Sequence, residues 1–171
     1  GVVVARDGIA MIVNPVNPVT NLMPEQIRGI FSGTLQNWKE VGGADQPIRV
    51  VSREAGSGTR SSFEQIMGGI RLLQDAIIQD SNGTIRETVA NDRSAIGYLS
   101  HGLLNEKVKA VPVDGISCVE IEITSGRYKL VRPVFLFTKG PPEGLAKDFM
   151  DYVLSAEGQE TIKRSGLLPA K

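Results

Sequence analysis

The stretch "SREAGSGTRSSFE", from Ser52 to Glu64, gathers residues that could bind an anion. Gly56 and Gly58 would let the backbone approach a ligand closely, because glycine has no side chain and tolerates unusual dihedral angles. Ser57 and Thr59 add hydroxyl groups that can donate hydrogen bonds. The combination predicts a turn whose backbone and hydroxyl donors face an oxyanion.

The segments on either side give this turn its context. Residues 48–52 predict a strand, and residues 59–66 predict a helix. The N–H groups of residues 58–60 would then lie at a helix start, where the helix supplies no acceptor and its dipole is positive. Arg53 adds a permanent charge that can fork onto an oxyanion. We therefore expect an anion site formed by Arg53, Ser57, Gly58 and Thr59.

Three neighbours are expected to support this site, namely Glu54, Gly56 and Arg60. We expect Glu54 to pair with Arg53 or Arg60 rather than to act as a base, and Arg60 to face away from the anion. A structural alternative stays open, in which Ser57 is an ordinary helix N-cap and the glycines form a tight turn. The turn matches neither a Walker loop, nor G-x-G-x-x-G, nor G-x-S-x-G, which argues against a nucleotide enzyme or a serine hydrolase.

Composition narrows the classes of partner. The chain has 171 residues, with 19 Lys and Arg against 19 Asp and Glu, and a pI near 6.8. This balance gives no support for nucleic acid or an anionic membrane as the main partner. Cys118 and His101 are the single cysteine and histidine, so an internal disulfide, a cysteine cluster and a multi-histidine site are excluded. We expect neither a metal nor any other cofactor, and we expect His101 on a surface loop.

Strand and helix signals alternate along the chain, which is typical of an α/β protein. We expect Phe31 and Trp38 in the core. No apolar run reaches the roughly 20 residues of a membrane helix, and no signal peptide is visible. Strands are expected at residues 8–13, 48–52, 95–99 and 109–113 and within 128–140; helices are expected within 20–33, at 59–66, 71–79 and 84–90, and as a pair within 141–166.

The turn resembles the anion-binding motif of the phosphate-binding proteins of bacterial ABC transporters. Other segments resemble the same family in the same order: "IFSG…NW" at residues 30–38, "AIGYLS" at 95–100, "SGRYKLVRPVFLFTKG" at 125–140 and "DFMDYVLSAEGQETIKRSGLLP" at 148–169. The resemblance covers essentially the whole chain, and the order of its motifs makes it specific.

The resemblance implies a type II periplasmic-binding-protein fold, in which two hinged α/β lobes hold the oxyanion between them. Residues 14–113 would form one complete lobe that carries the turn, and residues 1–13 and 114–171 a partial second lobe with the hinge crossovers. Family members have roughly 80–100 further residues before the position of Gly1, which hold the other half of the site. We therefore expect the chain to be a C-terminal portion of a longer protein. Asp7, near the crossover, is not expected to be a ligand.

The resemblance also implies a function. It predicts a receptor, not an enzyme, that binds inorganic phosphate and delivers it to the permease subunits of an ABC importer. The receptor would be periplasmic or otherwise extracytoplasmic, either soluble or anchored as a lipoprotein. Another tetrahedral oxyanion, a phosphate-ester enzyme that uses the same turn, and a signalling or adhesion module remain alternatives. For the chain alone we expect weak phosphate binding, and self-association through apolar surface at residues 2–4 and 134–137.

Overall fold

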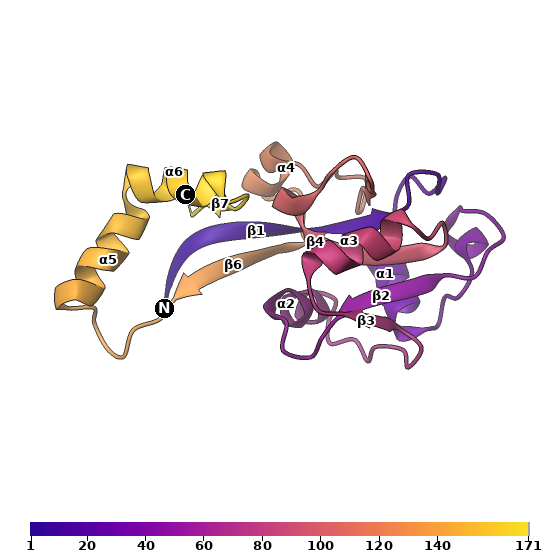
Figure 1. Cartoon of the computed structure of the whole chain (residues 1–171), viewed down its shortest axis with the longest axis horizontal. Helices are drawn as coiled ribbons and strands as arrows, with labels where there is room; N and C mark the ends of the chain where they lie inside the picture. The colour runs from indigo at the N-terminus through magenta and orange to yellow at the C-terminus, as the bar shows by residue number, and fades with distance from the viewer. Residues whose placement is uncertain (171) are drawn as a thin grey trace.

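The computed structural model describes residues 1–170 and shows an α/β fold (Figure 1). Within these residues one mixed sheet contains seven strands: β1 (Val2–Val13), β2 (Arg49–Arg53), β3 (Ile77–Gln79), β4 (Ala95–Ser100), β5 (Lys109–Val111), β6 (Val131–Leu136) and β7 (Leu168–Pro169). The helices are α1 (Pro24–Ser32), α2 (Gly58–Ile66), α3 (Asn82–Ala90), α4 (Glu120–Thr124), α5 (Gly144–Leu154) and α6 (Ala156–Arg164), with the short 3-10 helices η1 (Trp38–Val41) and η2 (His101–Leu103).

The long strand β1 organises the sheet because its two parts have different partners. Residues 9–13 pair antiparallel with β4, and residues 11–13 pair with β5. Residues 2–8 pair antiparallel with β6, and residues 5 and 6 also pair with β7. In Figure 1, β1 and β6 run between a group that contains α1, α2, α3, β2 and β3 and a group that contains α5, α6 and β7. The two groups are thus joined by a shared pair of strands.

Strand β2 lies between β3 and β4 and runs parallel to both. Parallel strands are usually covered on both faces, and every residue of β4 is buried here. Phe31 and Trp38 are 0% and 1% exposed, which confirms their predicted place in the core. Because β2 is held between two strands, the turn that follows Arg53 starts from a fixed position.

One predicted helix is wrong. Residues 71–76 form a loop, and Ile77 begins β3 instead of continuing a helix. The Leu73 N–H donates to the Phe31 carbonyl at 3.0 Å, and Ile77 pairs with Val51 of β2. Both contacts join residues far apart in the sequence, so the tertiary structure overrides the local helical pattern. The other predicted strands and helices are present, with bounds that differ by a few residues.

Candidate anion-binding site

The turn after β2 starts helix α2, as the sequence predicts, and Ser57 is its N-cap. The Ser57 N–H donates to the Glu54 carbonyl at 3.0 Å, and Ser57 Oγ accepts from the Arg60 N–H at 3.2 Å. The structural role considered for Ser57 is therefore real, and the Arg60 N–H is used by the cap and is not a free donor. The Ser57 hydroxyl still keeps its own proton for a ligand, because in this bond it only accepts.

Two backbone donors of the turn remain open. The Gly58 and Thr59 N–H groups donate to no acceptor within residues 1–170, as expected for the first positions of a helix. Thr59 is 5% exposed and Ser57 is 4% exposed. Hydroxyls that are so well covered have few orientations available. The helix start therefore offers two N–H groups and two hydroxyls in a fixed geometry, together with the positive end of the helix dipole.

Arg53 lies at the end of β2 and is held by its neighbour Glu54. Arg53 Nε donates to Glu54 Oε2 at 2.8 Å, and Nη2 donates to Oε1 at 3.0 Å. This pairing confirms one of the two partners expected for Glu54. The hydrogen bonds from Arg53 hold the pKa of the Glu54 carboxyl below its usual range, which makes Glu54 a poor general base. Arg53 Nη1 has only a 3.5 Å contact with Asn82 Oδ1, so it is the donor most available to an anion.

Arg60 braces the turn instead of extending into it. Arg60 Nη1 donates to the Arg53 carbonyl at 2.9 Å, and Nε donates to Glu64 Oε1 at 2.7 Å. These bonds tie the first turn of α2 to the last residue of β2. Arg60 is therefore a support for the turn in this structure, in keeping with the role expected for it.

An aromatic cluster lies beneath the turn. The Phe63 ring stacks on Tyr98 with centroids 4.2 Å apart, and Phe31 meets Phe63 edge to face at 4.8 Å. Tyr98 Oη lies 2.8 Å from Ser52 Oγ and accepts from the Arg53 N–H at 3.4 Å. Desolvation by burial raises the pKa of Tyr98, so the phenol stays neutral and keeps these bonds. The cluster fixes the end of β2 to the core.

A second polar cluster, centred on Asp7, was not found from the sequence. Asp7 is fully buried; its Oδ2 accepts from Arg132 Nε at 2.9 Å and its Oδ1 accepts from Ser100 Oγ at 2.5 Å. We expected His101 on a surface loop, but it begins η2 and its side chain is only 13% exposed. Its Nδ1 accepts from the Gly8 N–H at 3.3 Å and lies 3.7 Å from Asp7 Oδ1. A carboxylate within a mostly apolar strand was the available signal, because a buried charge requires a partner.

Asp7 predicts an acid-dependent loss of stability. Burial works to raise its pKa, but contacts with His101, Ser100 and Arg132 outweigh burial, and the pKa lies below the ordinary 3.8. A carboxyl with a lowered pKa in the folded state stabilises the fold above about pH 4, and this contribution is lost as the pH falls through the lowered pKa. We expect Asp7→Asn to flatten the decline in the free energy of unfolding between about pH 5 and pH 2, measured by denaturant titration.

The control for this pH series is Asp45→Asn, which changes an exposed carboxyl on a loop. We expect the Asp45 variant to follow the parent protein across the series. If the free energy of unfolding of the Asp7 variant falls in acid as steeply as that of the parent, the decline does not come from the buried ion pair.

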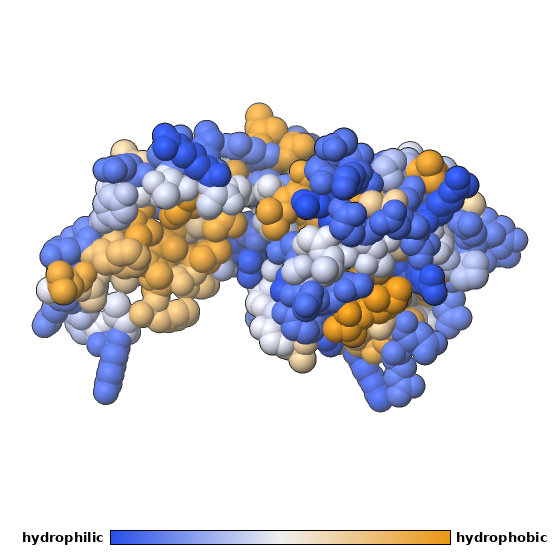
Figure 2. Space-filling view, in the orientation of Figure 1, coloured by the Kyte–Doolittle hydropathy of each residue, from blue (hydrophilic) through white to orange (hydrophobic). Residues whose placement is uncertain are grey.

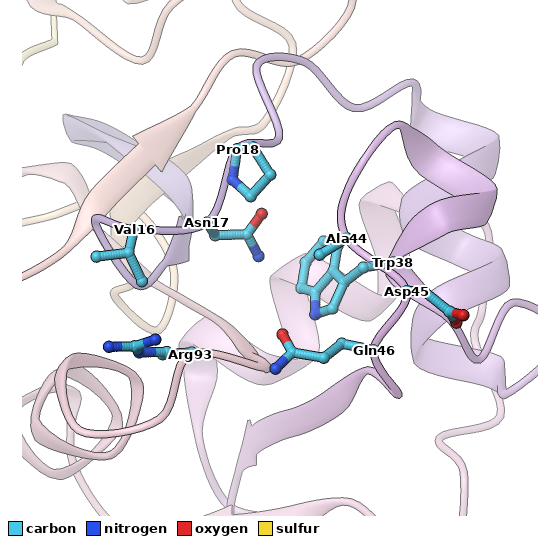
Figure 3. Close-up of a pocket in the computed structure, with 8 residues that line it drawn as sticks. All are labelled: Val16, Asn17, Pro18, Trp38, Ala44, Asp45, Gln46 and Arg93. Carbon is cyan, nitrogen blue, oxygen red and sulfur yellow. The ribbon is translucent and has the colours of Figure 1, made fainter.

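A separate cavity lies away from the turn (Figure 3). It has a volume of about 340 Å³ and is lined by Val16, Asn17, Pro18, Trp38, Ala44, Asp45, Gln46 and Arg93. Its Trp38 donates from Nε1 to the Ser94 carbonyl, and Ser94 accepts from the N–H of Arg49, the first residue of β2. The cavity is therefore near the start of β2, whereas the turn that begins α2 follows its end. Ligands of open α/β sheets bind at the carboxyl ends of the strands, which favours the turn.

Within residues 1–170, no group of three or more His, Cys, Asp or Glu side chains could hold a metal ion. None of the helices in that range is both long and apolar enough to cross a membrane. Cys118 is buried and free, and burial raises the pKa of its thiol to about 12, so it remains a thiol at neutral pH.

Comparison with known proteins adds independent findings to this geometry. Residues 1–157 match the family model described as "PBP superfamily domain". The phosphate-binding protein PstS of Bacillus subtilis is 36% identical over 160 residues, which are 93% of this chain and 53% of that protein. PstS 2 of Streptococcus agalactiae is 39% identical over 133 residues, which are 71% of this chain and 45% of that protein. The chain thus spans about half the length of these curated relatives.

Two solved structures are similar over nearly all of the chain. A putative phosphate ABC transporter substrate-binding protein of Clostridium perfringens, with bound phosphate, has a TM-score of 0.90 and 40% identity. The match covers 99% of this chain and 71% of that one. An ABC-type phosphate transport receptor of Vibrio cholerae has a TM-score of 0.90 and 36% identity, with 98% and 71% covered.

Proposed function

This chain belongs to the PBP superfamily and is PstS-like, and on that premise we propose that it carries the anion site of a receptor for inorganic phosphate. The fold is the type II periplasmic-binding fold that the sequence indicated. The receptor would release phosphate to the permease subunits of an ABC importer. It would work outside the cytoplasm, either soluble or anchored as a lipoprotein. The matched relatives are named as phosphate-binding or transport proteins, which supports a receptor over an enzyme.

The observation that carries this proposal is the start of α2. The open Gly58 and Thr59 N–H groups lie beside the hydroxyl of Ser57, and Arg53 enters the same turn on a rigid strand. Four oxygens of a tetrahedral anion can accept from several such donors at once. The matched phosphate-bound structure is 40% identical and similar over 99% of this chain, which supports phosphate as the occupant.

We also propose the division into lobes that the sequence suggested. Residues 14–113 would form one complete lobe that carries the anion turn. Residues 1–13 and 114–171 would belong to a second lobe, with β1 and β6 as crossovers. The change of pairing partners within β1 supports two lobes joined through this strand, but it lies between Gly8 and Ile9, so residues 9–13 pair with strands of the lobe that carries the turn.

Titration calorimetry tests the ligand class. The natural protein at its full length should bind phosphate saturably, and sulfate much more weakly or not at all. A preference for sulfate would favour the alternative of another tetrahedral oxyanion. Turnover of a chromogenic phosphate ester would favour an enzyme, although Glu54, the nearest carboxylate in the turn, is held by Arg53 and is a weak base. Neither sulfate preference nor ester turnover is expected.

We expect the 171-residue chain to self-associate in solution through the α5–β6 apolar face. This surface comprises Phe135, Phe137, Leu145, Phe149, Tyr152 and Leu154, which are 39–87% exposed. Figure 2 shows an apolar area on the group of elements that contains α5. Val4, which we expected from the sequence to lie in such a surface, is buried. Contiguous apolar surface of this kind tends to be covered by a partner, here a second copy.

Sedimentation velocity over a range of concentrations measures this self-association. The variant Phe137→Ser with Leu145→Ser should shift the protein towards monomer, because both side chains are more than three-quarters exposed and make little core contact. Val16→Ser is the control, since Val16 is 60% exposed but lies on the connector after β1. A parent chain that stays monomeric at high concentration would contradict the prediction.

A further inference from the structure

The guanidinium of Arg132, on β6, lies against the first residue of α2. A Cβ atom built on Gly58 would stand 3.3 Å from Arg132 Nη1. Gly58 does not have a positive φ, so its backbone conformation does not require glycine. A side chain at position 58 would instead crowd the guanidinium. The glycine thus leaves room for an arginine from a distant strand to reach the helix start.

Arg132 is held in this place by a buried carboxylate. Arg132 and Asp7 are direct cross-strand partners in the β1–β6 pair, and Arg132 Nε donates to Asp7 Oδ2 at 2.9 Å. The second oxygen of Asp7 is occupied by Ser100. This arrangement uses only the Nε donor of the guanidinium. Nη1 and Nη2 donate to no protein acceptor within residues 1–170, and the side chain is 26% exposed.

The electrostatics of this arrangement indicate an anion. A cation beside a helix N-terminus is unfavourable by itself, because the helix dipole is positive there. Here two arginines approach the same turn, Arg53 from β2 and Arg132 from β6, and each is fixed by one carboxylate, Glu54 or Asp7. An anion between the guanidinium groups and the open N–H groups would turn this repulsion into attraction.

We propose that Arg132 is a further anion-binding residue of the α2 site, and that Asp7 is its positioning residue. The inference rests on the proposed phosphate site and adds a donor from the crossover strand. One Nη group of Arg132 would donate to a phosphate oxygen while Nε stays on Asp7. Asp7 would contact the arginine and not the ligand, which agrees with its complete burial.

The test measures phosphate affinity in the natural protein at its full length. The double variant Asp7→Asn with Arg132→Gln removes both charges and keeps polar side chains at both positions, so that no buried carboxylate is left without a cation. We expect its Kd for phosphate to rise about 10- to 100-fold, which corresponds to the loss of one charged hydrogen bond. Arg132→Lys, which keeps the charge but loses the fork, should show a smaller loss.

Arg127→Gln is the matched control, because it removes one arginine from an exposed pair with Glu122. Its affinity should stay within about twofold of the parent. The melting temperature of each variant identifies any loss that comes from unfolding, and Arg132→Lys serves if the double variant is unstable. The inference is overturned if the folded Arg132 variants bind phosphate with the Kd of the parent while Arg53→Ala binds it more weakly. Absence of phosphate binding by the parent itself would instead overturn the proposed function.

Discussion

Replacing Arg53 with alanine is expected to weaken phosphate binding by at least about 100-fold in the natural protein at its full length. A hydrogen bond from a charged group contributes about 1.5–3 kcal/mol, and a guanidinium can form two of them, so the loss is about 3 kcal/mol or more. The affinity would be measured by titration calorimetry. The effect should be on affinity more than on folding, because Arg53 is at the end of its strand and its side chain pairs with the half-exposed Glu54.

The same strand provides the control for this experiment. Arg49 begins β2, and its side chain is 64% exposed in a pair with Asp92. Arg49→Ala removes an identical charge at the opposite end of the strand and should leave the Kd unchanged. Arg53→Lys separates charge from geometry, since lysine cannot fork and should recover only part of the affinity. An unchanged Kd for Arg53→Ala would remove Arg53 from the site.

The 171-residue chain by itself is expected to bind phosphate with a Kd of about 1 mM, if a complete receptor binds at about 1 μM. The donors described at the turn come from β2, α2 and β6, and Ala55 and Gly56 beside them are exposed. In a site that stays open to solvent, salt and water screen the electrostatic attraction between the donors and phosphate. About three missing charge-assisted bonds of roughly 1.5 kcal/mol each remove about 4–5 kcal/mol, or about three decades of affinity.

Amide chemical shifts measure such weak binding directly. Phosphate should shift the Gly58 and Thr59 signals at millimolar concentrations, and crystals grown from concentrated sulfate or phosphate should trap an anion at the turn. PstS of Bacillus subtilis is a suitable comparison under the same buffer, because this chain covers 53% of its length. Micromolar binding by the 171-residue chain would show that donors on one side of the anion suffice.

The local sequence was sufficient to predict the turn and the helix start that follow β2. The N-cap, the open N–H groups and the Arg53–Glu54 pair depend on neighbours within a few residues, so their types and spacing predict them. The same holds for α2, α3 and β4, whose patterns are short-ranged and agree with their burial. The loop and strand at residues 71–79 could not be predicted in this way, because β3 depends on its pairing with β2.

The second cluster was decided by the tertiary structure alone. Asp7 and Arg132 are 125 residues apart in the sequence, and they meet because the β1–β6 register makes them cross-strand neighbours. A shift of one residue in that register would turn one of the two side chains to the other face of the sheet. The sequence determined the turn that begins α2; only the packing of β6 against β1 and α2 brought Arg132 to it, because strand register is a property of the whole fold.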